Sequence, residues 1–101
     1  MLWKTMFAGF IALVPLAAAA QSGDSAGRSL AATCANCHGT EGHSVAPEVV
    51  PLAGLSKEHI QSQMKAFKEG TRPSTVMQQL AKGYTDRQIE SLAAYFAAQK
   101  R

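Results

Sequence analysis

The chain has 101 residues and a formal net charge of +3 at pH 7, with ten Lys and Arg against seven Asp and Glu. A chain of this length builds one domain around one hydrophobic core, and a composition of 47% hydrophobic and 17% charged residues excludes a disordered or fibrous chain. The charges form no block of one sign, so the sequence lacks the footprint of a nucleic-acid-binding surface. Two cysteines exclude a zinc site of four thiolates.

The first twenty residues have the pattern of a secretory signal peptide. Lys4 supplies the positive charge, an apolar stretch of ten residues follows over Thr5–Val14, and Ala18–Ala20 supply the small residues of a cleavage site. As a helix this stretch rises about 15 Å, about half of a bilayer core, so we expect no stable membrane span. We predict that residues 1–20 are removed on export to the periplasm and that residues 21–101 remain; the alternative is an uncleaved N-terminal anchor.

The mature chain is too short to depend on apolar burial alone. A chain of this size is usually stabilised by a disulfide, a metal or a cofactor. Export also places the two cysteines in an oxidising compartment, where neighbouring free thiols do not persist. We therefore expect Cys34 and Cys37 to belong to the group that stabilises the chain.

The mature chain predicts one small all-α domain with about three main helices. A polar leader over Gln21–Ser25 is expected to precede a short helical pattern that runs from Ala26 to a break at Gly39. The next segment, Thr40–Gly54, contains two glycines and two prolines and predicts a long ordered loop. We find no strand alternation of useful length, no internal repeat and no linker.

A helix with clear boundaries is predicted over Lys57–Glu69. Ser56 is suited to cap its first turn, and Gly70 ends it at the position where helices favour glycine. Apolar residues recur within it at the i, i+4, i+7 spacing, which indicates one buried stripe. The stripe consists of Ile60, Met64 and Phe67.

The C-terminal third predicts a loop, a short helical turn and a longer helix. Thr71–Met77 contains a proline and is expected to be a loop, and Val76–Lys82 has room for a single helical turn. Thr85 and Gln88 have the spacing of a capping box, which predicts a helix that runs to about Gln99. The apolar face of that helix consists of Ile89, Leu92, Ala93 and Phe96.

The motif that carries chemistry is Cys34-Ala35-Asn36-Cys37-His38, the C-x-x-C-H pattern of covalent c-type haem attachment. Three residues apart on a helical turn, the two thiols fall on one face, at about the separation of the two vinyl groups that they join on the porphyrin edge. The histidine follows the first cysteine by four residues and faces the same way, so its imidazole reaches the iron. We therefore predict one covalent haem c on Cys34 and Cys37, with His38 as an axial ligand.

Three other interpretations of the two cysteines compete with haem. A thioredoxin-like thiol pair needs a βαβ setting, which the sequence lacks. A structural disulfide between the two cysteines would close a very tight loop and leave His38 without a role. A zinc site would need further ligands from His43, His59 or carboxylates, which occur at no recognisable spacing.

The second axial ligand decides what the haem does. An iron held by histidine alone binds gases or peroxide, whereas a strong second ligand leaves no open position, and a methionine in this place raises the potential. Met77 follows a proline-containing loop and reaches the far face of the haem after one intervening helix, so we predict Met77 as this ligand; the alternative is an apolar plug beside the haem. Met64 is explained by its helix stripe, and we expect His43 and His59 to be surface residues.

These features resemble the class I cytochromes c, and the downstream segments resemble the cytochrome subunit of flavocytochrome c sulfide dehydrogenase. The C-x-x-C-H motif specifies haem c, and the segments after it specify the subfamily. The resemblance covers nearly all of the mature chain. Its segments are Gly39-Thr40, Gly42-x-Ser44-Val45, Ala66–Gly70, Ser74–Met77, Ala81–Tyr84 and Ala94–Phe96.

The resemblance implies a periplasmic one-electron carrier with no catalytic residues of its own. Its partner would be a flavoprotein subunit that carries FAD and oxidises sulfide, and a soluble cytochrome c would accept the electrons. The alternatives are a free cytochrome shuttle without a flavoprotein, a five-coordinate haem protein that binds ligands, and a haem-free thiol or zinc domain. In the family interpretation, Cys34 and Cys37 bind the haem, and His38 and Met77 are the axial ligands.

The chain departs from such relatives in two places. Some relatives carry two haem domains, whereas this chain has one C-x-x-C-H motif and would be a monohaem form. Relatives often have a proline in the loop where this chain has Val50, with Pro51 after it. In class I cytochromes a nearby backbone carbonyl accepts the ring N–H of the histidine ligand, and the sequence leaves this acceptor open among Val49, Val50 and Pro51.

Further residues are expected around the haem. Two tyrosines, Tyr84 and Tyr95, either hydrogen-bond near a propionate or only pack. Four lysines either guide partner docking at the exposed haem edge or form a solvated basic face, and the apolar residues of the two longer helices form the core or wall the haem. The lysines are Lys57, Lys65, Lys68 and Lys82, and the apolar residues are Ile60, Met64, Phe67, Ile89, Leu92 and Phe96.

Overall fold

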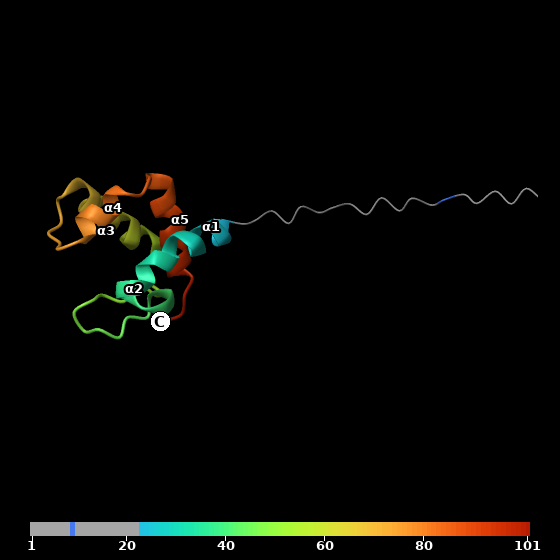
Figure 1. Cartoon of the computed structure of the whole chain (residues 1–101), viewed down its shortest axis with the longest axis horizontal. Coiled ribbons are helices and arrows are strands. Elements are labelled where there is room, and N and C mark those ends of the chain that lie inside the picture. The colour runs from blue at the N-terminus through green and yellow to red at the C-terminus, as the bar shows by residue number, and fades with distance from the viewer. Residues whose placement is uncertain (1–8, 10–22) are drawn as a thin grey trace, which may run out of the picture.

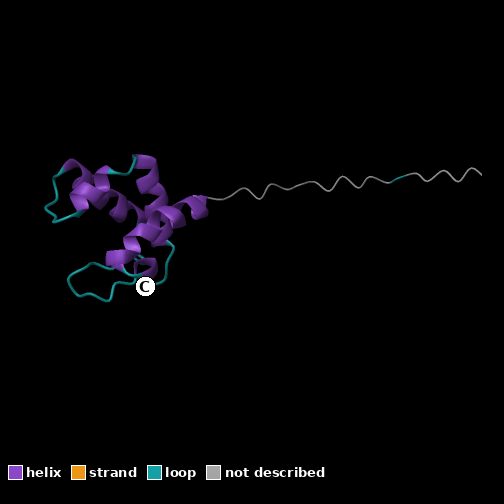
Figure 2. Cartoon of the chain, in the orientation of Figure 1, coloured by secondary structure: helices purple, strands orange, loops and turns teal. Residues whose placement is uncertain are grey.

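Helices make up most of the part of the chain that the structure describes, and no strand occurs there (Figure 2). The computed structural model describes Gly9 and residues 23–101, so the predicted signal peptide, apart from Gly9, and its cleavage site lie outside the described residues. None of the described helices is long and apolar enough to cross a membrane. The elements are α1 Gly23–Ala31, the 3₁₀ turn η1 Ala32–Cys34, α2 Ala35–His38, the 3₁₀ turn η2 Thr40–Gly42, α3 Lys57–Glu69, α4 Met77–Lys82 and α5 Asp86–Ala97.

The three longer helices, α1, α3 and α5, form the body of the described domain, which confirms the predicted all-α fold (Figure 1). α5 packs against both α1 and α3, and the short α4 packs against α3. The loop after α2, drawn in green, and the loop before α4, drawn in yellow to orange, project from the same side of this body (Figure 1). The loop that follows His38 and the loop that precedes Met77 are therefore attached to one helical scaffold.

Local signals set both ends of α3, as predicted. The hydroxyl oxygen of Ser56 accepts a hydrogen bond of 3.1 Å from the backbone N–H of His59, which caps the first turn. Gly70 ends the helix in the left-handed conformation, with φ of 77°, and its N–H donates back to Phe67. The boundaries Lys57–Glu69 are therefore those that the sequence predicts.

The capping box of α5 is also confirmed, although the helix ends at Ala97 and not near Gln99. The N–H of Gln88 donates to the Thr85 hydroxyl at 3.1 Å, and the N–H of Thr85 donates to the Gln88 side-chain oxygen at 2.9 Å. At the other end, the carbonyl of Phe96 accepts from Gly54 at 2.9 Å and from Gln99 at 3.1 Å. Because the N–H groups of Gly54 and Gln99 donate to the Phe96 carbonyl, the regular hydrogen-bond pattern of the helix does not continue beyond this point.

α1 begins earlier than predicted. Of the expected polar leader Gln21–Ser25, residues 23–25 form the first turn of α1, and the remainder lies outside the described residues. α1 packs closely on α5 at Gly27, where an added Cβ would lie 2.5 Å from the carbonyl oxygen of Ser91 and 3.3 Å from the Cβ of Tyr95. Packing between helices outweighs weak local propensity, so the polar composition of the leader gave the wrong boundary.

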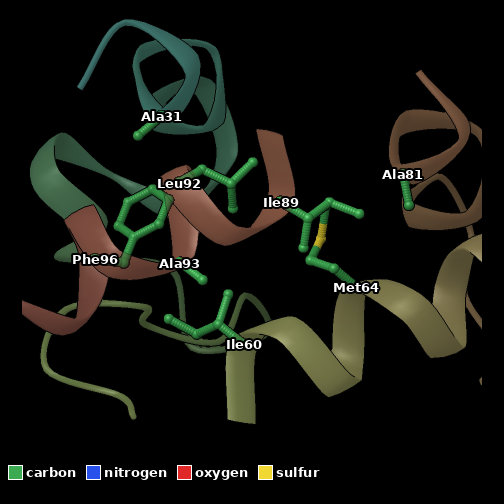
Figure 3. Packing of buried hydrophobic residues seen from close by; sticks show 8 residues of the cluster. All are labelled: Ala31, Ile60, Met64, Ala81, Ile89, Leu92, Ala93 and Phe96. Atoms are coloured by element: carbon green, nitrogen blue, oxygen red, sulfur yellow. The ribbon is translucent and has the colours of Figure 1, made fainter. Parts of the chain in front are cut away.

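The core lies where α1, α3 and α5 meet (Figure 3). Five of the six predicted apolar residues are buried in it, whereas Phe67 is half-buried, with the Arg72 guanidinium 4.6 Å from its ring centroid. Alanines fill much of the remaining space, so the buried cluster of the described domain is small. Its members are Ala31, Ile60, Met64, Ala81, Ile89, Leu92, Ala93 and Phe96.

The close contact between α1 and α5 is tested by Gly27→Ala. A glycine-to-alanine change usually stabilises a helix interior, but here the new methyl group meets the backbone of Ser91. We expect the free energy of unfolding to fall by about 1–3 kcal/mol, measured by denaturant unfolding followed by circular dichroism. Ser29→Ala, an exposed position on the same helix, is the control and should retain native stability. A Gly27→Ala variant as stable as the natural protein would contradict the packing described here.

Candidate functional site

The C-x-x-C-H motif folds as one continuous helical turn. Cys34 is the last residue of η1, and Cys37 and His38 lie in α2, which ends where Gly39 adopts φ of 80°. Cys34 is half-buried, Cys37 is exposed, and both thiols are unpaired. The predicted alternative of a structural disulfide between them is therefore not formed, and both sulfurs are available for thioether bonds.

The thiol environment also disagrees with a redox-active cysteine pair. Burial raises the pKa of the Cys34 thiol; the neighbouring Thr33 side chain offsets this in part, and the neighbouring Cys37 adds to it. Reactive thiols of thioredoxin type need a lowered pKa and an electropositive setting. Within residues 23–101, moreover, no group of three or more His, Cys, Asp or Glu side chains is arranged to hold a metal ion.

The His38 ring is fixed by the loop that follows it. Its Nδ1 lies 2.7 Å from the carbonyl oxygen of Val50. A carbonyl only accepts hydrogen bonds, so Nδ1 carries the proton and Nε2 keeps its lone pair. This is the arrangement of a histidine that binds a metal through one nitrogen and is oriented through the other. Of the three acceptors that the sequence leaves open, Val50 is therefore the one, and Val49 and Pro51 are not.

The loop that carries Val50 is in turn anchored to the turn after His38. The carbonyl of Gly42 accepts from the backbone N–H groups of Leu52, at 2.9 Å, and Ala53, at 3.2 Å. Gly42 is buried with φ of 83°, and an added Cβ there would lie 2.7 Å from the nitrogen of Ala53. Only glycine fits this conformation and this approach. The acceptor for His38 is thus held by backbone geometry.

His43 has a structural position in this loop. Its Nδ1 lies 3.0 Å from the carbonyl oxygen of Thr40, and its Nε2 lies 2.5 Å from the carbonyl oxygen of Lys100. Both ring nitrogens therefore face the backbone and join the turn after α2 to the C-terminal segment. His59 is exposed in the first turn of α3. The role of His43 in this structure is therefore to join two backbone segments.

The two methionines of the described domain occupy different environments. Met64 is buried, at 8% exposure, and its side chain lies beside Ile89 in the core (Figure 3). Met77 is the first residue of α4, half-buried at the edge of the core. The hydroxyl of Ser74 accepts from the N–H of Gln78 at 3.0 Å and fixes the start of this helix. The position of Met77 therefore suits a ligand, whereas packing accounts for Met64.

The four exposed large hydrophobic side chains among the described residues are near the predicted ligands in the sequence. They lie in two segments, one between α2 and α3 and one that spans the residue before α4 and α4 itself. Two unpaired thiols and an oriented imidazole form a donor set that fits haem c. The four residues are Val45, Val50, Val76 and Leu80.

The structure gives contacts within the chain for some of the tyrosines and lysines whose roles the sequence left open. The Tyr84 hydroxyl lies 3.0 Å from the hydroxyl oxygen of Thr33, a contact that sequence reasoning missed because no local signal links residues so far apart in the chain. Lys57 pairs with Glu90 at 3.2 Å. Lys68 also lies in an ion pair, whereas Lys65 and Lys82 are exposed without an ion-pair partner among the described residues.

A family model described as cytochrome c matches residues 25–100 of the chain. The chain belongs to the cytochrome c family. The structure accordingly has the small all-α fold of the class I cytochromes c, and the family carries covalently bound haem c and transfers electrons. The C-x-x-C-H motif and the oriented histidine described above agree with this membership.

Similar proteins include several bacterial cytochromes. The cytochrome subunit of sulfide dehydrogenase from Chlorobaculum tepidum is 46% identical over 74 residues, covering 72% of this chain and 66% of that protein. Cytochrome c4 from Pseudomonas aeruginosa is 41% identical, over 78% of this chain and 40% of that protein. Cytochrome c-554(548) from Halomonas halodenitrificans is 36% identical, over 78% of this chain and the full 100% of that protein. The chain thus spans two thirds or less of the first two relatives and all of the third.

The structural position of His43 predicts the behaviour of His43→Ala. We expect the absorption spectrum of the haem to stay unchanged, because the ring contacts backbone carbonyls, and the free energy of unfolding to fall by about 1 kcal/mol. The control His59→Ala should change neither quantity. A change in the haem spectrum of His43→Ala would instead place His43 at the iron.

Proposed function

We propose that this cytochrome c carries one haem c on thioethers at Cys34 and Cys37, with His38 and Met77 as the axial ligands, and that it transfers single electrons in the periplasm. We propose further that it is the haem subunit that accepts electrons from an FAD-bearing flavoprotein of a sulfide dehydrogenase. One observation carries the assignment of His38. The Val50 carbonyl holds the proton on Nδ1 of His38 and leaves Nε2 free, next to two unpaired thiols.

The residues of the chain account for electron transfer without acid–base chemistry. When bound, haem c supplies a ferric–ferrous couple that takes up and releases one electron. His38 and Met77 would hold the iron and would leave no position open to other ligands, and a methionine ligand would raise the potential. Burial and the polarity around a haem also tune its potential. No nucleophile–base pair is needed for this role.

The flavoprotein partner is supported by the sulfide dehydrogenase subunit among the relatives. An exposed apolar side chain also suits a stable subunit contact: Val45 is 97% exposed in the loop after α2. The exposed Lys65 and Lys82 are available to guide the encounter, whereas Lys57 and Lys68 already form ion pairs. Electrons would leave to a soluble cytochrome c.

A free shuttle is the second candidate, and the Halomonas halodenitrificans cytochrome favours it, because that protein is covered over its full length by this chain. Both candidates need export. We propose that residues 1–20 are the signal peptide and that cleavage after Ala20 leaves one monohaem domain over residues 21–101. N-terminal sequencing of the mature protein tests this boundary.

Paired methionine variants test the axial ligand. We expect Met77→Leu to lose the sulfur-to-iron charge-transfer band of the ferric protein and to bind carbon monoxide readily in the ferrous state, because the sixth position opens. Met64→Leu makes the same chemical change in the core and should keep the band and exclude carbon monoxide. The ligand assignment is wrong if Met77→Leu keeps both properties of the natural protein.

Purification from the native periplasm tests the partner. We expect flavin and haem to co-purify in equal amounts, and the haem to stay on the polypeptide after acid denaturation and extraction with organic solvent. Haem without flavin or any associated flavoprotein would favour the free shuttle. Haem that is lost on extraction would contradict the thioether bonds at Cys34 and Cys37 and the proposal as a whole.

A further inference from the structure

A hydrogen bond connects the two segments that carry the proposed iron ligands. Thr33 directly precedes Cys34 on the histidine side, and Tyr84 follows α4, the helix that begins with Met77. Their hydroxyl oxygens are 3.0 Å apart, although the residues are 51 positions apart in the sequence. The bond therefore joins the histidine side to the methionine side directly, without passing through the haem.

The direction of this bond follows from the other contact of Thr33. Its hydroxyl donates to the carbonyl of Leu30 at 3.2 Å. A hydroxyl has one proton, so the proton between Thr33 and Tyr84 comes from the tyrosine. A chain of hydrogen bonds thus runs from Tyr84 through Thr33 to the last turn of α1. The tyrosine phenol is the donor on which the link depends.

Lys68 fixes the backbone of the same tyrosine to α3. Its Nζ donates to the carbonyl oxygen of Tyr84 at 2.6 Å and lies 3.7 Å from the carboxylate of Asp86. The side chain of Tyr84 is half-buried against the core. Tyr84 is therefore held at its carbonyl by α3 and at its hydroxyl by the segment before Cys34, and a movement of α4 away from the haem would strain or break these bonds.

We propose that Tyr84 is a positioning residue for the ligand pair: its hydrogen bond to Thr33 holds the Met77 helix at a fixed place relative to Cys34 and His38 and so keeps the methionine on the iron. This inference rests on the proposed His38 and Met77 ligation. It gives Tyr84 a role other than contact with a propionate. It also predicts that the bond resists opening of the sixth position, because an added ligand enters only when Met77 leaves.

Imidazole binding to the ferric holoprotein measures this opening. We expect Tyr84→Phe to bind imidazole about two- to ten-fold more tightly than the natural protein, which corresponds to the loss of one hydrogen bond. Thr33→Val, at an exposed position, should give a similar increase, and the double variant should show no more than either single change, because both remove the same bond. Thr33→Ser keeps the hydroxyl and should restore the native affinity.

Controls separate this role from a general effect on folding. Tyr95→Phe removes a hydroxyl without a hydrogen-bond partner among the described residues and should leave imidazole affinity unchanged. If Tyr84→Phe lowers the free energy of unfolding but leaves imidazole affinity native, or if the effects of Tyr84→Phe and Thr33→Val add, the positioning role is wrong. A natural protein that lacks the sulfur-to-iron band would instead contradict Met77 ligation, and with it the proposed function.

Discussion

The hydrogen bond between the His38 ring and the Val50 carbonyl is the constraint on which the site depends. It sets the tautomer of the imidazole and the direction of its free nitrogen. A backbone acceptor is suited to this task because it cannot be lost by a change of side chain. Its position depends instead on the path of the loop, which the buried Gly42 fixes through its carbonyl and its positive φ. A conformation available to glycine thus determines the orientation of a side chain four residues earlier in the chain.

The domain distributes its large apolar residues between a small internal core and exposed positions in the two segments of the proposed ligands. The internal cluster unites α1, α3 and α5, but four large hydrophobic side chains remain exposed in the two segments beside the proposed haem. In a chain this short, a bound apolar group adds contacts that the polypeptide does not supply by itself. Function and stability therefore depend on the same surface, and the haem is expected to be a structural component as well as a redox centre.

Features with a local signal could be predicted from the sequence, whereas features set by contacts between distant segments could not. Ser56 and Gly70 fix α3 through their own backbone and side-chain preferences, and the motif from Cys34 to His38 specifies its chemistry by spacing. The start of α1 depends on the approach of Gly27 to α5. The hydrogen-bond acceptor for His38 depends on where the loop turns back. Every residue has a backbone carbonyl, so no residue type in the sequence indicates which one accepts.

The last residues of the chain lie against the loop between α2 and α3. The carbonyl of Lys100 contacts the His43 ring, and an added Cβ on Gly54 would lie 2.6 Å from the side chain of Arg101. A purification tag joined directly to Arg101 would therefore begin beside the loop that orients the His38 ring. A C-terminal tag can therefore affect the orientation of His38. The reduction potential of tagged protein is best compared with that of untagged protein before it is interpreted.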